Sequence, residues 1–273
     1  MRSAHYVYAI VRPGTPLPHI GAGGIGPGLD MVRWRELAAV TERIEDAGAP
    51  VTMEAVLHHE TVVEAVRQHG PALPVRFGTV FPDATSVASA LAERCELLAS
   101  DLDRLGDKVE LSLTALWPTD PVSEEQATPA GEGTTAPNAG VRYLYARAAE
   151  LRRAEAMKKR ARSLAANLDQ VLGGWALEQR VSFLPTPRIA LRAAYLLDPV
   201  AVAAFRTVFD TMRCEQREVR LLLTGPWPPY SFVTRAETKD DSETDGRLAE
   251  LTRVLTRCDT DAPRLNGRGA LND

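Results

Sequence analysis

Three neighbouring residues, His58, His59 and Glu60, form the first place in the sequence where metal or acid–base chemistry could be located. Histidine and carboxylate side chains are common zinc ligands. The spacing argues against a metal site, because adjacent residues of a helix point about 100° apart. The zinc motif HExxH would also need a histidine where Val63 stands. We therefore expect one histidine to be buried and hydrogen-bonded, or to contact a neighbouring element.

A glycine-rich segment at residues 21–26 (GAGGIG) matches the dinucleotide-binding pattern GxGxxG. That pattern binds phosphate only where it opens a helix whose N-terminus faces the anion. Here Pro27 and Gly28 follow at once, so we interpret the segment as a loop. No GxSxG nucleophile motif is present either. The sequence thus predicts no catalytic residue, no metal and no cofactor, and an enzyme with a dispersed site stays as an alternative.

The three cysteines, Cys95, Cys214 and Cys258, are odd in number and far apart in the sequence. This spacing predicts neither a zinc site nor a disulfide framework. Free cysteine behaves as a small hydrophobic residue, so we expect Cys95 and Cys214 to be buried.

Basic residues gather in one stretch of a predicted helix, residues 142–172, where Glu150 and Glu155 are interleaved with them. We predict a solvated helical face, and contact with an acidic patch of a partner is the alternative. The net charge of −4 and the pI near 5.8 argue against a general nucleic-acid binder. The basic residues are Arg152, Arg153, Lys158, Lys159, Arg160 and Arg162.

The first half of the chain predicts a small α+β sandwich with one helical layer. Alternation and β-branched residues indicate strands at both of its ends, and the apolar spacing between them indicates two helices. Thr52 is a candidate N-cap, and residues 31–45 hold either two short strands or a strand and a helix. The expected elements are strands at 5–11 and 109–116 and helices at 52–69 and 84–105.

The second half predicts another α+β unit, so the fold class is α+β with two small ferredoxin-like α/β-sandwich domains. Gly173 and Gly174 predict the end of its long helix, because glycine is common just after the last residue of a helix. The expected elements are helices at 142–172 and 199–212 and strands at 180–184, 189–197 and 219–223. The predicted boundaries are 1–117 and 141–235 for the domains, 118–140 for a flexible linker and 236–273 for a polar tail with a short amphipathic helix.

Two segments combine proline, glycine and large aromatic residues, which mark turns of one particular geometry. They are residues 73–79 (LPVRFGT) and 224–232 (TGPWPPYSF). We expect the Arg76 guanidinium to be partly buried and paired with a carboxylate, with Glu54 and Glu60 as the candidates and an interface role as the alternative. The Trp227 and Tyr230 rings are expected to pack between the sheet end and a neighbouring element, or else to be exposed hot spots.

These two segments resemble the signature of the gas vesicle protein F/L family (GvpF/GvpL). Four further segments resemble the same family in the same order, and the resemblance spans roughly residues 5–235. A ferredoxin-like plan for both halves is also what the resemblance suggests. The further segments are 6–11 (YVYAIV), 59–66 (HETVVEAV), 182–186 (SFLPT) and 193–198 (AAYLLD).

The resemblance implies a role in gas vesicle formation as a minor structural component or assembly factor, without catalysis. The implied partners are the hydrophobic major shell subunit and other assembly proteins, in the cytoplasm and at the gas vesicle. No apolar run reaches the ~20 residues that span a bilayer. A ligand-sensing module at the domain interface is the alternative. Candidate contacts are a sheet edge, the domain seam and the tail helix, with the residues Arg76, Phe77, Gly78, Trp227, Pro228, Tyr230, Leu251 and Leu255.

Overall fold

The computed structural model describes residues 3–19, 28–45, 52–118, 139–183, 186, 188–216 and 218–234, with the backbone alone for 139–142. All of them belong to one compact unit, Met1–Thr234. Several predictions lie outside the described residues, namely the glycine loop at 21–26, most of the linker, Cys258 and the tail helix with Leu251 and Leu255.

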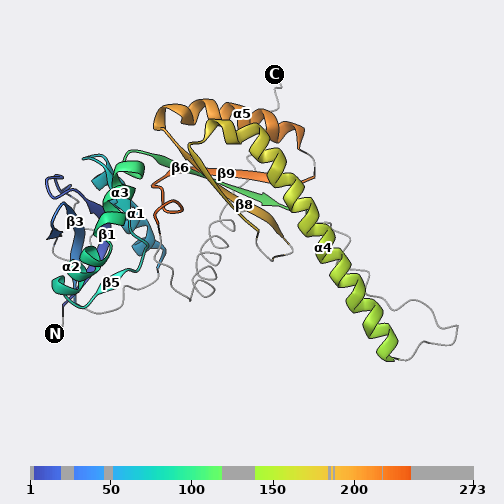
Figure 1. The fold of residues 1–273 in the computed structure, drawn as a ribbon, viewed down its shortest axis with the longest axis horizontal. Coiled ribbons are helices and arrows are strands. Elements are labelled where there is room, and N and C mark those ends of the chain that lie inside the picture. Colours follow the sequence, from blue (N-terminus) through green and yellow to red (C-terminus); the bar gives the residue numbers. More distant parts are fainter. Residues whose placement is uncertain are drawn as a thin grey trace, which may run out of the picture. The chain divides into compact units, whose positions relative to one another are not determined.

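The first sheet is antiparallel, with strand order β2-β3-β1-β4 and β5 also paired with β1 (Figure 1). Helix α1 packs on one face through Val62, Val63 and Val66, and helices α2 and α3 pack on the other face. The elements are β1 (Ala4–Val11), β2 (Leu29–Trp34), β3 (Leu37–Ile44), α1 (Met53–Arg67), β4 (Ala72–Pro74), β5 (Val80–Phe81), α2 (Ala84–Glu93) and α3 (Cys95–Leu105).

The expected single helical layer is therefore wrong for this sheet. Every residue of β1 is buried, because successive side chains alternate between the two faces and both faces of this strand are apolar. Tyr6 and Tyr8 point toward α1, whereas Val7 lies in the core with α2 and α3. A sheet with two apolar faces needs a helical layer on each side.

The second sheet is also antiparallel, with strand order β7-β8-β6-β9. Helices α4 and α5 cover one face, with Leu164, Leu168, Phe205 and Phe209 in the shared core. The elements are β6 (Val109–Leu116), α4 (Ala139–Leu172), η1 (Gly173–Trp175), β7 (Glu178–Ser182), β8 (Ile189–Leu197), η2 (Pro199–Ala201), α5 (Val202–Glu215) and β9 (Arg220–Trp227).

Strand β6 belongs to this second sheet and not to the first-half sandwich in which the sequence analysis placed it. It lies between β8 and β9, where Leu113 is opposite Ala193 on one side and Leu223 on the other. Alternation along a strand predicts which residues share a face and does not say which sheet the strand joins. The domain boundaries themselves stay a prediction.

Most other predicted elements agree with the structure. Thr52 caps α1, since its Oγ1 accepts a hydrogen bond of 3.2 Å from the backbone N–H of Ala55. The predicted helix at 84–105 is two helices, because Arg94 leaves helical geometry at φ −124°, ψ 17°. Residues 31–45 form two strands around a turn.

Cys95 is buried as expected, but Cys214 is exposed. The buried side chains of α5 are Phe205, Phe209 and Met212, which lie at helical spacing on one face. Cys214 is two residues beyond Met212, so it points about 200° away from the core.

The second face of the second sheet contributes to the core of the first half. Ala194 and Leu196 of β8 lie in one cluster with Leu98 and Leu102 of α3 and with Phe232. The two halves of the described chain therefore share a hydrophobic core.

Candidate functional site: two motifs joined by helix α1

One buried histidine, His59, is hydrogen-bonded to the first motif, residues 73–79. His59 is 1% exposed, and its Nε2 lies 3.0 Å from the carbonyl oxygen of Val75. Because a carbonyl can only accept, Nε2 carries the proton and Nδ1 accepts from the Tyr6 hydroxyl at 2.9 Å. The Tyr6 oxygen in turn accepts the backbone N–H of Gly78 at 2.9 Å. This chain of hydrogen bonds requires a neutral imidazole, and burial lowers the pKa of His59 to about 4.

A second tyrosine extends this cluster to a buried acid. The Tyr8 hydroxyl donates to Oε2 of Glu42 at 2.6 Å, and Glu42 is 2% exposed. The Tyr8 ring stacks on His59 with centroids 5.4 Å apart. Burial raises the pKa of Tyr6 to about 12 and also raises the pKa of Tyr8. Both tyrosines are therefore neutral hydrogen-bond donors at physiological pH.

Arg76 does not make the expected ion pair. Its side chain is half-buried, and no described contact joins it to Glu54 or Glu60. Its carbonyl oxygen instead accepts from the backbone N–H of Thr79 at 3.3 Å and from the Thr79 hydroxyl at 2.7 Å. The turn of the first motif is thus closed by backbone and hydroxyl contacts.

The other two predicted residues of this motif face the same cluster. The Phe77 ring meets Tyr6 and His59 edge-on, with centroids 6.2 and 5.7 Å apart. Gly78 has φ +82°, a conformation that side chains disfavour. That conformation directs the N–H of Gly78 to Tyr6.

The second motif, residues 224–232, also contacts α1, at Glu60. Glu60 follows His59, and it accepts a hydrogen bond of 2.9 Å from the Tyr230 hydroxyl. Burial raises the pKa of Glu60 and that of Tyr230. Pro228 is buried, whereas Trp227 is 45% exposed. Tyr230 thus packs against a neighbouring element, as one prediction had it, and Trp227 stays exposed.

Residues 228–234, which we call the C-terminal strap, are held by buried carboxylates. Glu110 of β6 is 4% exposed and accepts from the backbone N–H of Ser231 at 2.8 Å and from its hydroxyl at 2.7 Å. Asp101 of α3 is 3% exposed and accepts from the N–H and hydroxyl of Thr234 at 2.6 and 3.0 Å. Each acid therefore binds one residue of the strap through two donors.

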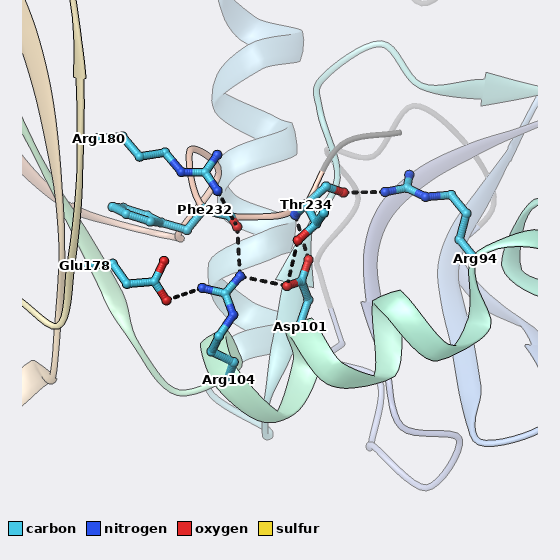
Figure 2. Close-up of polar contacts among 7 residues, drawn as sticks. All are labelled: Arg94, Asp101, Arg104, Glu178, Arg180, Phe232 and Thr234. Atoms are coloured by element: carbon cyan, nitrogen blue, oxygen red, sulfur yellow. Dashed lines mark hydrogen bonds and ion pairs between the residues drawn. The ribbon is translucent and has the colours of Figure 1, made fainter. Parts of the chain in front are cut away.

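An arginine of α3 ties the strap to the second sheet, as Figure 2 shows. Arg104 donates to Asp101 at 2.7 Å and to the carbonyl of Phe232 at 3.1 Å. The same guanidinium pairs with Glu178 of β7. One side chain thus contacts a helix of the first half, the strap and an edge strand of the second sheet.

Two further arginines contact the strap (Figure 2). Arg180 of β7 donates to the carbonyl of Phe232 at 3.4 Å and lies 5.5 Å from the centre of its ring. Arg94 donates to the carbonyl of Thr234. The carbonyls of the strap, like its N–H groups, are therefore bonded by charged side chains from both halves.

These contacts anchor the C-terminal strap, and the carboxylates that make them are engaged in hydrogen bonds. The acids that contact the strap, Glu60, Glu110 and Asp101, each accept from at least one strap donor. The described residues contain no group of three or more histidine, cysteine, aspartate or glutamate side chains placed to bind a metal. A surface depression lined by Asp83 and Ser86 lies along α2, outside both motifs. The two sequence motifs thus meet on adjacent residues of α1 and lock the halves together.

A family model described as "Gas vesicle synthesis protein GvpL/GvpF" matches residues 4–234. The chain belongs to the GvpL/GvpF family. This family of gas vesicle proteins is involved in gas vesicle formation.

Relatives named for both branches of the GvpL/GvpF family are similar to this chain. "Gas vesicle protein L" of Streptomyces sp. (strain CB03234) is 30% identical over 85% of this chain and 93% of its own length. "Gas vesicle protein F" of the same strain is 29% identical over 84% of this chain and 98% of its own length. These two relatives are therefore similar to this chain to nearly the same degree.

Two crystal structures of GvpF share the fold. The protein from Anabaena sp. PCC7120 aligns with a TM-score of 0.62 at 18% identity, over 86% of this chain and 98% of the other. The protein from Microcystis aeruginosa aligns with a TM-score of 0.60 at 18% identity, over 85% and 99%. Among the described residues of this family member, no helix has the length and apolar content to cross a membrane.

Proposed function

We propose that this GvpL/GvpF family member acts by binding, without catalysis, and that its partner is the hydrophobic shell subunit of the gas vesicle. It would serve as a minor component or assembly factor and would also meet other assembly proteins, in the cytoplasm and at the vesicle. The observation that supports this most directly is an exposed apolar strip along β7. Leu177, Val181 and Phe183 are 54%, 37% and 49% exposed there.

Strand β7 is at the edge of the second sheet, and no described strand pairs with its outer side. Residues 177, 181 and 183 fall on one face of the strand because side chains alternate. Gln179 lies on the same face and is hydrogen-bonded to Asp169 of α4. An edge with free backbone groups and apolar side chains on one face is a template for another strand. A hydrophobic subunit that awaits assembly offers such a strand or surface, and binding here would shield it from uncontrolled association.

Side-chain contacts on the opposite face of β7 hold the edge in place. Arg180 and Glu178, on the opposite face of β7, are bonded to the strap and to Arg104. The strap is in turn held by Glu110 and Asp101. A rigid edge loses less conformational entropy when a partner strand binds.

The experiment is co-purification of the full chain with the shell subunit. Val181→Asp combined with Phe183→Asp should reduce retention of the subunit about tenfold or more, because charges on an apolar strip oppose a hydrophobic strand. Val200→Asp is the matched control, since Val200 is 90% exposed and lies in η2. Equal retention by the strip variant and the control would refute binding at β7.

A second pair of variants tests the predicted tail helix in the same assay. Leu251→Asp with Leu255→Asp should leave retention unchanged if the subunit binds at β7. Loss of retention in this tail variant alone would move the contact to the tail. If even the unmodified chain retains no subunit, direct shell binding is wrong.

A further inference from the structure

The N-terminal half of α4, residues 143–160, is a helix without a packing partner among the described residues. None of its side chains is buried, and the buried residues of α4 begin only at Ala161. The core contacts of the helix come from Leu164, Leu168 and Leu172 near its other end. Figure 1 shows α4 continuing beyond the strands that its C-terminal part covers. In globular proteins most helical stability comes from packing of this kind.

This half-helix exposes large apolar side chains. Tyr143, Leu144, Tyr145 and Leu151 are between 57% and 70% exposed. Leu144, Ala148 and Leu151 are spaced by four and three residues, so they form a narrow stripe along one face. Two leucines on a helical stripe are typical of a helix–helix contact.

The same half-helix is strongly basic in an otherwise acidic chain. Residues 143–160 contain six basic and two acidic side chains, whereas the whole chain has a net charge of −4. By helical geometry Arg147 and Lys158 lie on one side of the stripe, and Arg152 and Lys159 lie on the other. Glu155, four residues after Leu151, ends the apolar stripe. Charges that flank a stripe select the partner helix by complementarity.

Most of these charges are available to a partner. Arg147 pairs with Glu150 at 2.9 Å, and Arg160 lies 3.5 Å from Glu218 and over the Trp117 ring. The structure shows no ion pair for four other basic side chains of the half-helix among the described residues, and all four are exposed. They are Arg152, Arg153, Lys158 and Lys159.

We propose that residues 143–160 form the docking surface for an acidic amphipathic helix of another protein. A second copy of this chain is disfavoured, because two such helices would place basic flanks against basic flanks. A membrane surface is disfavoured because basic residues occupy both flanks of a narrow stripe, which leaves no wide apolar face to insert. Nucleic acid would not require the leucine stripe. This surface is separate from the β7 strip, so it goes beyond the proposed shell binding.

The test uses a fluorescent synthetic peptide of about three heptads, with leucine at the a and d positions and glutamate at the e and g positions. Fluorescence anisotropy with the full chain should show saturable binding. A peptide of the same composition in scrambled order should bind about tenfold or more weakly, because it lacks the stripe. Equal binding of both peptides would reveal charge attraction alone and would overturn the proposal.

Two variants separate the stripe from its flanks. Leu144→Glu with Leu151→Glu, and Arg152→Glu with Lys159→Glu, should each weaken binding of the ordered peptide about tenfold or more. The control Arg33→Glu with Arg188→Glu changes the charge equally at exposed sites on other elements and should bind as the unmodified chain does. Far-UV circular dichroism checks that all variants are folded.

Three further measurements decide between occupants. Sedimentation should show that the chain does not dimerise through this helix, and a dimer abolished by the Arg152→Glu and Lys159→Glu pair would overturn the proposal in favour of a second copy. Anionic lipid vesicles or single-stranded DNA that bind more tightly than the peptide would overturn it in favour of those ligands. Because shell-subunit retention is measured separately at β7, failure of one proposal leaves the other standing.

Discussion

The two motifs of this chain are anchored by opposite kinds of chemistry. The first motif is bonded by neutral groups, the imidazole of His59 and the hydroxyl of Tyr6. The second is bonded by carboxylates, with Glu60, Glu110 and Asp101 each accepting from the strap. The neutral anchor fixes a turn inside the first half, and the acidic anchors join that half to the end of the described chain. Protonation of His59 would therefore break the anchor of the first motif, and removal of a carboxylate would break an anchor of the second.

The largest expected difference in unfolding free energy between variants of the two motifs comes from their glycines. Gly225 has φ +110°, and a Cβ there would stand 2.7 Å from the carbonyl oxygen of Glu110. Gly225→Ala should therefore cost about 3–4 kcal/mol of unfolding free energy, from backbone strain and overpacking together. Gly78 has φ +82° with open space around it, so Gly78→Ala should cost about 1 kcal/mol. Urea unfolding of both variants measures the contrast, and equal losses would refute it.

Acid should weaken the first motif through His59. The folded pKa is about 4 and the ordinary value is 6.5. Below pH 6.5 the unfolded chain binds a proton that the folded chain excludes, so stability falls until the pH reaches about 4. At 1.36 kcal/mol for each pKa unit the loss is about 3 kcal/mol.

The histidine variant isolates this effect from other titrating groups. His59→Phe removes the titration, so its unfolding free energy should fall less than that of the unmodified chain between pH 7 and pH 4. Glu60 titrates in both proteins, and its effect largely cancels in the difference. Parallel pH profiles for the two proteins would show that His59 is not the sensitive group.

The carboxylate anchor can be tested without changing its shape. Glu110→Gln retains the volume but replaces one acceptor with a donor, which faces the N–H and hydroxyl of Ser231. We expect a loss of about 2 kcal/mol, as for other hydrogen bonds to charged groups. The exposed Glu93→Gln is the matched control and should change the unfolding free energy by less than about 0.5 kcal/mol.

The smallest expected effect is at the point where the motifs meet. Tyr230→Phe removes one hydrogen bond to Glu60 and should cost about 1 kcal/mol. The loss should be present at pH 7 and should shrink as acid protonates Glu60, whose pKa is raised by burial. A loss that grows on acidification would contradict this account, and denaturant unfolding at two pH values decides it.

Local patterns in the sequence predicted most elements because those patterns act over a few residues. The apolar spacing and the Thr52 cap predicted α1, and alternation predicted β6 with its bounds Val109–Leu116. The interruption at Arg94 carries neither glycine nor proline, so no local signal marks it. Strand β9 extends through Pro226, which an edge strand tolerates because one side has no ladder to donate to.

The site was predicted only in part, because its contacts join residues that are far apart in the chain. The sequence indicated one buried histidine and singled out both motifs. It gave no reason to choose Glu110 or Asp101, which lie 121 and 133 residues from their partners Ser231 and Thr234. The available signal was Glu110 itself, the single acid in the alternating sequence of β6. Of the two carboxylates expected to pair with Arg76, Glu60 accepts from Tyr230 instead.

The position of β6 in the second sheet also sets the order of events on the ribosome. Its two neighbours, β8 and β9, begin at Ile189 and Arg220, so β6 is complete about 70 residues before β8 begins. At roughly 5–20 residues per second this leaves a nascent strand with two open edges for several seconds or longer. During that interval the new strand exposes apolar side chains and unpaired backbone groups, the condition in which incomplete chains tend to associate.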